Sequence, residues 1–413
     1  MMACGKSELN IFDSVPTQVA ITSSSFSDYH PISKVINTAE FVINTSSYLD
    51  LNDSILVAKL CVKNKDGTAL VKDANCCLVN NALSSIIKDV SVCVNGVQIE
   101  NTNTLYPYKS LFNILLNYDA DSSNSQFDAC GFYKTDNIND IHANNKEMVA
   151  KSKSISLAGP LFLDLFMQSK YIIPNTELRI KLTLSSNEFV VKSPDAKLKL
   201  RYELDDLVLY VRSVNVHPSV EKAHMDGLKL NNAIYPLQKT ELKYFNIANG
   251  STSFSIENIF SGRIPKFVCF AMVKSSAQNG SFKENPFNFK HNNVNFIGLY
   301  RNGIAVNKEM TPDFENNLIA REYMSLLQAC NIYAKNISNS ISFEEFQKDG
   351  YVIFAYNLTP DLESSSVCKQ TNMLGNLRLD LRFAKALTES INLIFMGVFD
   401  GELQITKTGD VFI

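Results

Sequence analysis

The sequence predicts an all-β protein made of two eight-stranded jelly rolls in tandem, with short helices inserted between strands. Short runs of alternating apolar and polar residues recur along the chain between turn residues, as in sandwiches and barrels. An Asn-Gly turn between apolar strands also occurs twice, at Asn95-Gly96 and at Asn302-Gly303, and this pair is a strong hairpin signal. The two copies lie about half of the 413-residue chain apart. This spacing indicates two copies of one domain.

An amphipathic helix follows each Asn-Gly hairpin. The first begins near Pro107 and contains Tyr108-Lys109-Ser110-Leu111, and the second contains Tyr323-Met324-Ser325-Leu326. Apolar residues at positions i, i+3, i+4 and i+7 define the apolar face of the first helix. We therefore expect helices over 107–117 and 316–329, in equivalent places of the two rolls.

The strands of the first roll are expected over residues 31–214. Its apolar alternations lie at Ile32–Ile43, Tyr48–Val62, Asn75–Ile99, Leu178–Leu184 and Leu198–Leu204, and Leu207–Val211, apolar on both faces, is typical of a central strand. Residues 1–30 are polar and mixed, so we interpret them as an N-terminal arm with little fold of its own. Residues 118–153 form a long polar connection.

The second roll is expected over 234–413, after a linker at 215–233 that contains Pro218. Its strands are predicted at Thr240–Ile247, Ser253–Ile256, Phe267–Val273, Asn295–Val306, Tyr351–Asn357, Leu377–Phe383, Ile391–Phe399 and Glu402–Lys407. Residues 275–293 form a second long polar loop. Ser342-Phe343-Glu344-Glu345 is a capping box that predicts a short helix ending before Gly350.

Composition favours an ordinary globular protein that is made inside a cell. Hydrophobic residues are 45% and charged residues 20%, and the formal net charge is −3, so nothing indicates a chain that grips nucleic acid along its backbone. The nine cysteines are odd in number and form no C-x-x-C pair, which predicts reduced thiols. No apolar stretch approaches the ~20 residues of a membrane-spanning helix.

The sequence contains no convincing set of catalytic residues. The five histidines are scattered, and none has the spacing to another ligand that a metal site needs. Ser85-Ile86-Ile87-Lys88 matches the pattern of acylating serines without its partner motifs, and we interpret it as a chance match. Asp205-Asp206 is interpreted as a break in strand register. We therefore expect no catalytic residue, no metal, no cofactor, no small-molecule substrate and no enzymatic activity.

Several segments resemble the double jelly-roll major capsid proteins of Polinton/Maverick elements and adintoviruses. No single match is a strong motif, but their order and spacing along nearly the whole chain are specific. The matching segments are Glu8–Phe12, Pro16–Gln18, Tyr29–Ile32, Asn95-Gly96, Thr104–Tyr108, Leu115-Leu116, Tyr323–Leu326, Ser342–Phe346, Gly350-Tyr351, Leu358–Leu362, Gly375–Arg378 and Arg382–Ala384.

This resemblance implies a structural, self-assembling protein. In that family three subunits form a pseudo-hexagonal capsomer, and capsomers tile an icosahedral shell around double-stranded DNA. The expected partners are therefore copies of the chain itself, first in a homotrimer and then in a capsid lattice, and a single jelly-roll penton or minor capsid protein. The shell would enclose DNA without sequence-specific binding. The expected location is the virion capsid, assembled inside the host cell.

The trimer contacts are predicted from the loop at 275–293. It carries three large apolar side chains, Phe282, Phe287 and Phe289, with no strand of their own to bury them. One interpretation is that they fold back onto their own domain. The other is that they dock on the neighbouring subunit, as aromatic anchors do at interfaces.

Two other functions are compatible with jelly rolls. A glycan- or receptor-binding protein is the main alternative, and it would be a monomer or a small oligomer. A cupin-type enzyme is disfavoured because its clustered histidines are missing. The oligomer separates these hypotheses, since a capsid protein forms trimers that grow into shells.

Overall fold

The computed structural model describes residues 17–33, 35–134, 143–195, 199–348, 350–364, 369–371 and 373–413. Residues 1–16, which hold the first match to the capsid family, the start of the second and most of the predicted arm, lie outside this described part. So do residues 135–142 of the predicted polar connection, and Cys4 and Cys368.

The first roll is a sandwich of two antiparallel four-stranded sheets, and the chain is ordered so that its first and last strands pair. One sheet has the order β1-β10-β3-β7, with β1 (Ile21–Tyr29), β10 (Leu200–Val216), β3 (Tyr48–Asn64) and β7 (Ile155–Gly159). The other has the order β2-β8-β5-β6, with β2 (Thr38–Ile43), β8 (Leu178–Leu184), β5 (Ile87–Val94) and β6 (Val97–Asn101). A short pair, β4 (Cys77–Leu78) with β9 (Val191–Lys192), lies apart from both sheets.

The second roll repeats this plan. One sheet has the order β11-β20-β14-β17, with β11 (Ala233–Ile247), β20 (Ile391–Ile405), β14 (Phe267–Lys274) and β17 (Ile353–Asn357), and β21 (Val411–Phe412) adds to β20. The other has the order β12-β19-β15-β16, with β12 (Ser253–Ile256), β19 (Leu377–Phe383), β15 (Val294–Arg301) and β16 (Ile304–Ala305). The short pair here is β13 (Arg263–Ile264) with β18 (Met373–Leu374).

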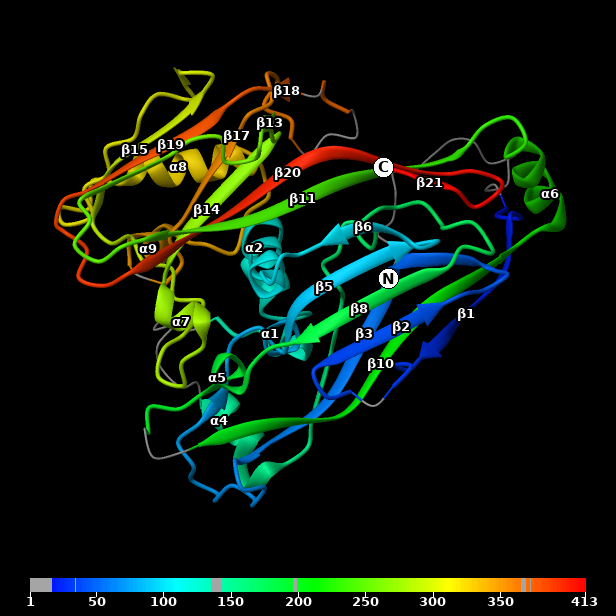
Figure 1. Ribbon diagram of the computed structural model, residues 1–413, viewed down its shortest axis with the longest axis horizontal. Helices are drawn as coiled ribbons and strands as arrows, with labels where there is room; N and C mark the ends of the chain where they lie inside the picture. Colours follow the sequence, from blue (N-terminus) through cyan, green and yellow to red (C-terminus); the bar gives the residue numbers. More distant parts are fainter. Residues whose placement is uncertain are drawn as a thin grey trace, which may run out of the picture.

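The predicted internal repeat is confirmed by this strand order. Helix α2 (Tyr106–Asn117) follows β6 and precedes β7, and helix α8 (Ala320–Ala329) follows β16 and precedes β17. The two helices therefore connect equivalent strands, as the paired Tyr-x-Ser-Leu segments predicted. Figure 1 shows the two rolls side by side, with α2 between them. The protein thus has the predicted double jelly-roll fold.

The local signals that marked the repeat behave as expected. Asn95 and Gly96 have φ of 46° and 81°, and Asn302 and Gly303 have φ of 52° and 83°, the left-handed values that a two-residue hairpin turn needs. The capping box is present at Ser342, which caps α9 (Phe343–Gln347). The predicted break at Asp205 is confirmed as a register shift between β10 and β3.

The N-terminal segment differs from the expectation of an arm with little fold of its own. Residues 21–29 form β1, which pairs along its length with the last part of β10, from Val216 to Leu209. Its polar sequence hid this strand because an exposed edge strand needs no buried apolar row. The segment that we predicted as a linker contains the helix α6 (Pro218–Gly227), which His217 caps.

The long polar connections also carry structure. The described part of 118–153 contains α3 (Ala120–Ser123), α4 (Ala143–Val149) and the 3-10 turns η1 (Asp128–Cys130) and η2 (Ala150–Ser152). The loop at 275–293 begins with α7 (Ser275–Asn279). Two further short helices, α1 (Ala82–Ser85) and α5 (Asn187–Val190), belong to the first roll.

Candidate functional site: the junction between the two rolls

Helix α2 is buried on every side. Each of its residues from Tyr106 to Leu116 is buried, although a helix on the surface of a roll would keep one polar face in water. The cover comes from the second roll, where Phe287 and Phe289 lie with their ring centres 5.6 and 5.5 Å from those of Tyr108 and Phe112, respectively. The junction therefore has a core of its own, which combines a helix of the first roll with a loop of the second.

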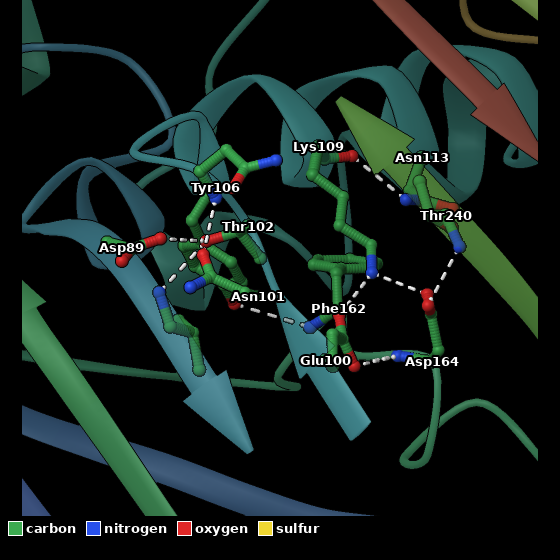
Figure 2. Close-up of polar contacts among 12 residues, drawn as sticks. Asp89, Glu100, Asn101, Thr102, Tyr106, Lys109, Asn113, Phe162, Asp164 and Thr240 are labelled. Carbon is green, nitrogen blue, oxygen red and sulfur yellow. Dashed lines mark hydrogen bonds and ion pairs between the residues drawn. The ribbon is translucent and has the colours of Figure 1, made fainter. Parts of the chain in front are cut away.

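A buried ion-pair cluster lies at the centre of this junction. The Lys109 ammonium, in α2, is 2.5 Å from a carboxylate oxygen of Glu100 and 2.5 Å from one of Asp164. Glu100 belongs to β6, and Asp164 lies in the segment after β7. Figure 2 shows Lys109 reaching down from the helix between the two carboxylates. All three side chains are buried.

The cluster also fastens the second roll to the first. The backbone N–H of Thr240, in β11, donates to Asp164 over 2.8 Å, and the backbone N–H of Asp164 donates to Glu100 over 2.8 Å. Buried carboxylates need this kind of hydrogen bonding to offset their lost hydration. Asp164 therefore accepts one bond from each roll, from Lys109 and from Thr240.

Other side chains of the first roll bind the free edge of β11 in the same way. The Asn103 amide donates to the carbonyl of Leu242, and the Lys170 ammonium donates to the carbonyl of Ile234 over 2.8 Å. The bound backbone groups belong to Ile234, Thr240 and Leu242, which are all an even number of residues apart on β11. Their backbone groups therefore point to the same side of the strand, away from β20. Side chains of the first roll thus occupy the outer edge of the first strand of the second roll.

Burial and charge act against each other within the cluster. Burial raises the pKa of the Glu100 carboxyl to about 7; Lys109 opposes this rise and Asp164 adds to it. Burial alone would lower the pKa of Lys109, but Asp164 and Glu100 outweigh it and raise that pKa instead. Lys109 therefore stays an ammonium, which suits a structural cation and does not suit a nucleophile.

A cavity of about 510 Å³ adjoins the cluster. Asn113, Leu116 and Asp164 line it from the first roll, and Phe267 and Val398 line it from the second. Lys266 also lines it and pairs with Asp400 over 2.8 Å. Its walls thus come from both rolls, and they include the C-terminal end of α8.

Within the described ranges, no group of three or more His, Cys, Asp or Glu side chains is placed to hold a metal ion. The described cysteines are free thiols. Burial raises the pKa of Cys76 to about 11 and that of Cys77 to about 12, so both are protonated at neutral pH and unreactive as nucleophiles. No helix in the described part is long and apolar enough to cross a membrane.

The predicted trimer contacts need correction. Phe287 and Phe289 have no exposed surface and pack against α2 of the same chain, while Phe282 is half-buried. The sequence suggested that these side chains lack a strand to bury them, because the first roll, which buries them, is distant in sequence. Neither interpretation describes Phe287 and Phe289, because they contact the other roll of their own chain. Phe282 stays a predicted trimer contact.

Sequence reasoning did not identify the ion-pair cluster. Its members are distant in sequence, and no motif joins Glu100, Lys109 and Asp164. One signal was available: Lys109 is the sole charged residue of a twelve-residue helix. A helix with so little charge is typical of an element buried on all sides.

Comparison with solved structures shows the same fold. A chain from the cryo-EM structure of the Sputnik virophage matches with a TM-score of 0.67 and 14% identity, covering 100% of this chain and 92% of that one. The mavirus major capsid protein matches with a TM-score of 0.60 and 12% identity, covering 100% and 95%. A chain of the PBCV-1 virus capsid matches with a TM-score of 0.60 and 10% identity, covering 98% and 100%.

Sequence comparison adds one informative relative. Uncharacterized protein F54H12.2 of Caenorhabditis elegans is 25% identical over 359 residues, which are 83% of this chain and 85% of the nematode protein. No protein-family model matches the sequence.

Proposed function

We propose that this chain is a major capsid protein, whose activity is to associate with copies of itself. Three copies would form a pseudo-hexagonal capsomer, and capsomers would tile an icosahedral shell around double-stranded DNA. The observation that carries this proposal is the extent of the fold likeness. Both rolls, and the connection between them, are matched over essentially the whole length of the mavirus major capsid protein and of this chain.

The proposal extends to the Polinton/Maverick and adintovirus type. The motif resemblance along the chain supports this type, and so does a relative of similar length among the proteins of an animal, C. elegans. A single jelly-roll protein at the vertices would be the second component of the shell. The chain would act in the virion capsid after assembly inside the host cell.

The first test is to express the full chain and determine its mass and its assemblies. We expect trimers of the 46.2 kDa chain by light scattering, and shells or hexagonal sheets of capsomers by electron microscopy. A protein that stays monomeric at high concentration and forms no lattice would contradict the proposal and favour the glycan- or receptor-binding alternative. A glycan array on the same sample would then test that alternative.

A further inference from the structure

Helix α6 connects the ends of the two rolls without burying a side chain of its own. None of its residues from Pro218 to Gly227 is buried, although most helices in proteins are stabilised by packing of an apolar face. Figure 1 shows α6 at the right-hand end of the molecule, where it joins β10 to β11. The ring centres of His224 and Tyr48 are 5.7 Å apart, and Nδ1 of His224 lies 2.8 Å from the Tyr48 hydroxyl oxygen. This contact holds α6 over the end of the first roll.

A groove of about 560 Å³ lies between α6 and the two rolls. Its volume falls within the roughly 300–1,000 Å³ that is typical of pockets for small organic groups. Ile234 of β11, which lines the groove, is 45% exposed. The apolar part of the lining includes Tyr171, Ile173, Val216, Ala223, Leu228 and Ile234. An exposed apolar surface with a polar rim is typical of a site where another segment binds.

The N-terminal end of the described chain lies at this groove. Ile21, the first residue of β1, pairs with Val216, which lines the groove. The backbone N–H of His217 donates to the carbonyl of Ala20 over 2.7 Å, and His217 caps α6. Residues 1–16 therefore join the described chain beside the N-terminus of α6.

This N-terminal segment contains an apolar pair that suits the groove. Ile11 and Phe12 lie between polar residues, and Phe12 is five residues before the first described residue. Five residues of extended chain span at most about 18 Å, so the pair can reach a groove beside which the chain enters. Asp13 follows the pair and Lys170 lines the groove, and these two side chains carry opposite charges.

We propose that Ile11 and Phe12 bind in the groove between α6 and the rolls of their own chain, with Asp13 beside Lys170. The same chain is favoured over a second copy because a short tether gives the segment an effective concentration of roughly millimolar order. The contact covers the exposed side of Ile234 and gives α6 the apolar packing that it lacks. It needs one copy of the chain, so it does not rest on the proposed capsid function.

Photocrosslinking of the full chain tests where residue 12 lies. The variant Phe12→benzoylphenylalanine is irradiated, and its crosslinked peptides are identified by mass spectrometry. We expect crosslinks to α6 and to residues 231–235, in a product that keeps the mass of one 46.2 kDa chain under denaturing conditions. The matched control carries the same probe at Val71, an apolar residue that is 71% exposed and does not line the groove. It should give no crosslink to α6.

Charges in the segment test what the contact does for α6. The double variant Ile11→Asp with Phe12→Asp should increase hydrogen exchange in α6 by about tenfold or more, because it removes the burial of two apolar side chains. Exchange in α2 should remain unchanged. The control, Ser7→Asp with Asn10→Asp, adds the same two negative charges outside the apolar pair, and it should exchange like the wild type.

A charge in the groove tests the other side of the contact. Ala223→Glu should remove the crosslinks from position 12, whereas Lys222→Glu, on the same helix but outside the lining, should keep them. A crosslinked product with the mass of two chains would overturn the assignment to the same chain. Crosslinks outside the groove, or exchange in α6 that does not respond to the Ile11 and Phe12 substitutions, would overturn the groove as the site. Trimers and shells are measured separately, so either failure leaves the capsid proposal intact.

Discussion

Helices α2 and α8 share a sequence pattern and the same place in the order of elements, yet one is a core element and the other is a surface element. Every residue of α2 from Tyr106 to Leu116 is buried, whereas the buried residues of α8 are Glu322, Leu326 and Ala329. The difference lies in what covers them. Helix α2 has the second roll of its own chain beside it, whereas one side of α8, with Arg321, Met324 and Gln328, is exposed.

The two helices show which interactions stabilise a single roll and which stabilise the packing of two rolls. Helix α8 is stabilised by its contacts with β17 and α9. Helix α2 has no exposed face. In its place are an ion-pair cluster and an aromatic contact with the second roll. Each substitution below changes a residue near one of the two helices, and the other helix or a residue near it provides a control.

The largest effect is expected from Lys109→Met, which gives α2 the residue of α8. Two buried carboxylates would lose their cation, and removing one partner of a buried ion pair costs about 3–5 kcal/mol of folding free energy. The reciprocal change, Met324→Lys, places a charge at an exposed position and should change folding stability by less than about 0.5 kcal/mol. Urea unfolding of both variants measures the difference, and equal losses would contradict the comparison.

Phe289→Ala should also destabilise the fold, by at least about 3 kcal/mol, because it opens a cavity against Tyr108 and Phe112. Phe343→Ala, in α9, is the control, since Phe343 is 40% exposed. It should change the melting temperature far less. If Phe289→Ala kept wild-type stability and changed only the oligomeric state, the interpretation of this loop as an anchor between subunits would be supported instead.

The pH dependence of stability should depend on Glu100. Its pKa in the folded protein, about 7, lies above its ordinary value of 4.5, so the folded state holds a proton that the unfolded state releases. This contribution is fully present below pH 4.5 and is lost as the pH rises through 7. The wild type should therefore melt at a higher temperature at pH 5 than at pH 8, by roughly 2–6 °C.

Glu100→Gln should flatten this slope, because the amide cannot titrate. Glu344→Gln, an exposed residue of α9, should leave the slope unchanged. Thermal unfolding at four values between pH 5 and pH 8 is sufficient for the comparison. A slope that is the same in all three proteins would show that another group titrates.

The smallest effect is expected at the cap of α9. Ser342→Ala removes the side-chain acceptor of the capping box and should cost about 1 kcal/mol. Because Phe343 and Phe346 of α9 contact Tyr323 of α8, hydrogen exchange should increase in α8 and remain unchanged in α2. Ser338→Ala, in the exposed loop before the cap, should change neither helix.

Much of the fold could be predicted because its signals are local. An Asn-Gly pair requires left-handed backbone wherever it forms a tight turn, and the Ser342 capping box is complete within four residues. The strand β1 was missed because it lies at an edge, where the sequence Ile21–Tyr29 has no need of alternating apolar residues. Strand prediction from periodicity detects burial, and β1 has little.

The junction could not be predicted from the sequence, for a different reason. Lys109 is explained by Glu100, Asp164 and the backbone of Thr240, and these meet when two complete rolls pack together. The sequence places Phe287 and Phe289 in a loop with no strand to bury them, and it gives no sign that the other roll of the same chain does so. A core shared between two domains produces no periodic apolar pattern in the sequence of either domain.

The pairing of the first strand of each roll with its last long strand has a consequence for synthesis of the chain. Ile21 pairs with Val216, and Ala233 pairs with Ile405, so the first roll can close while the ribosome still has most of the second to make. Contacts so distant in sequence form slowly. During that interval β11 is not yet held by β20, and α2 is still exposed to water. Charged Lys109, Glu100 and Asp164 then give the unfinished junction a hydrated centre, where a wholly apolar one would bind other nascent chains.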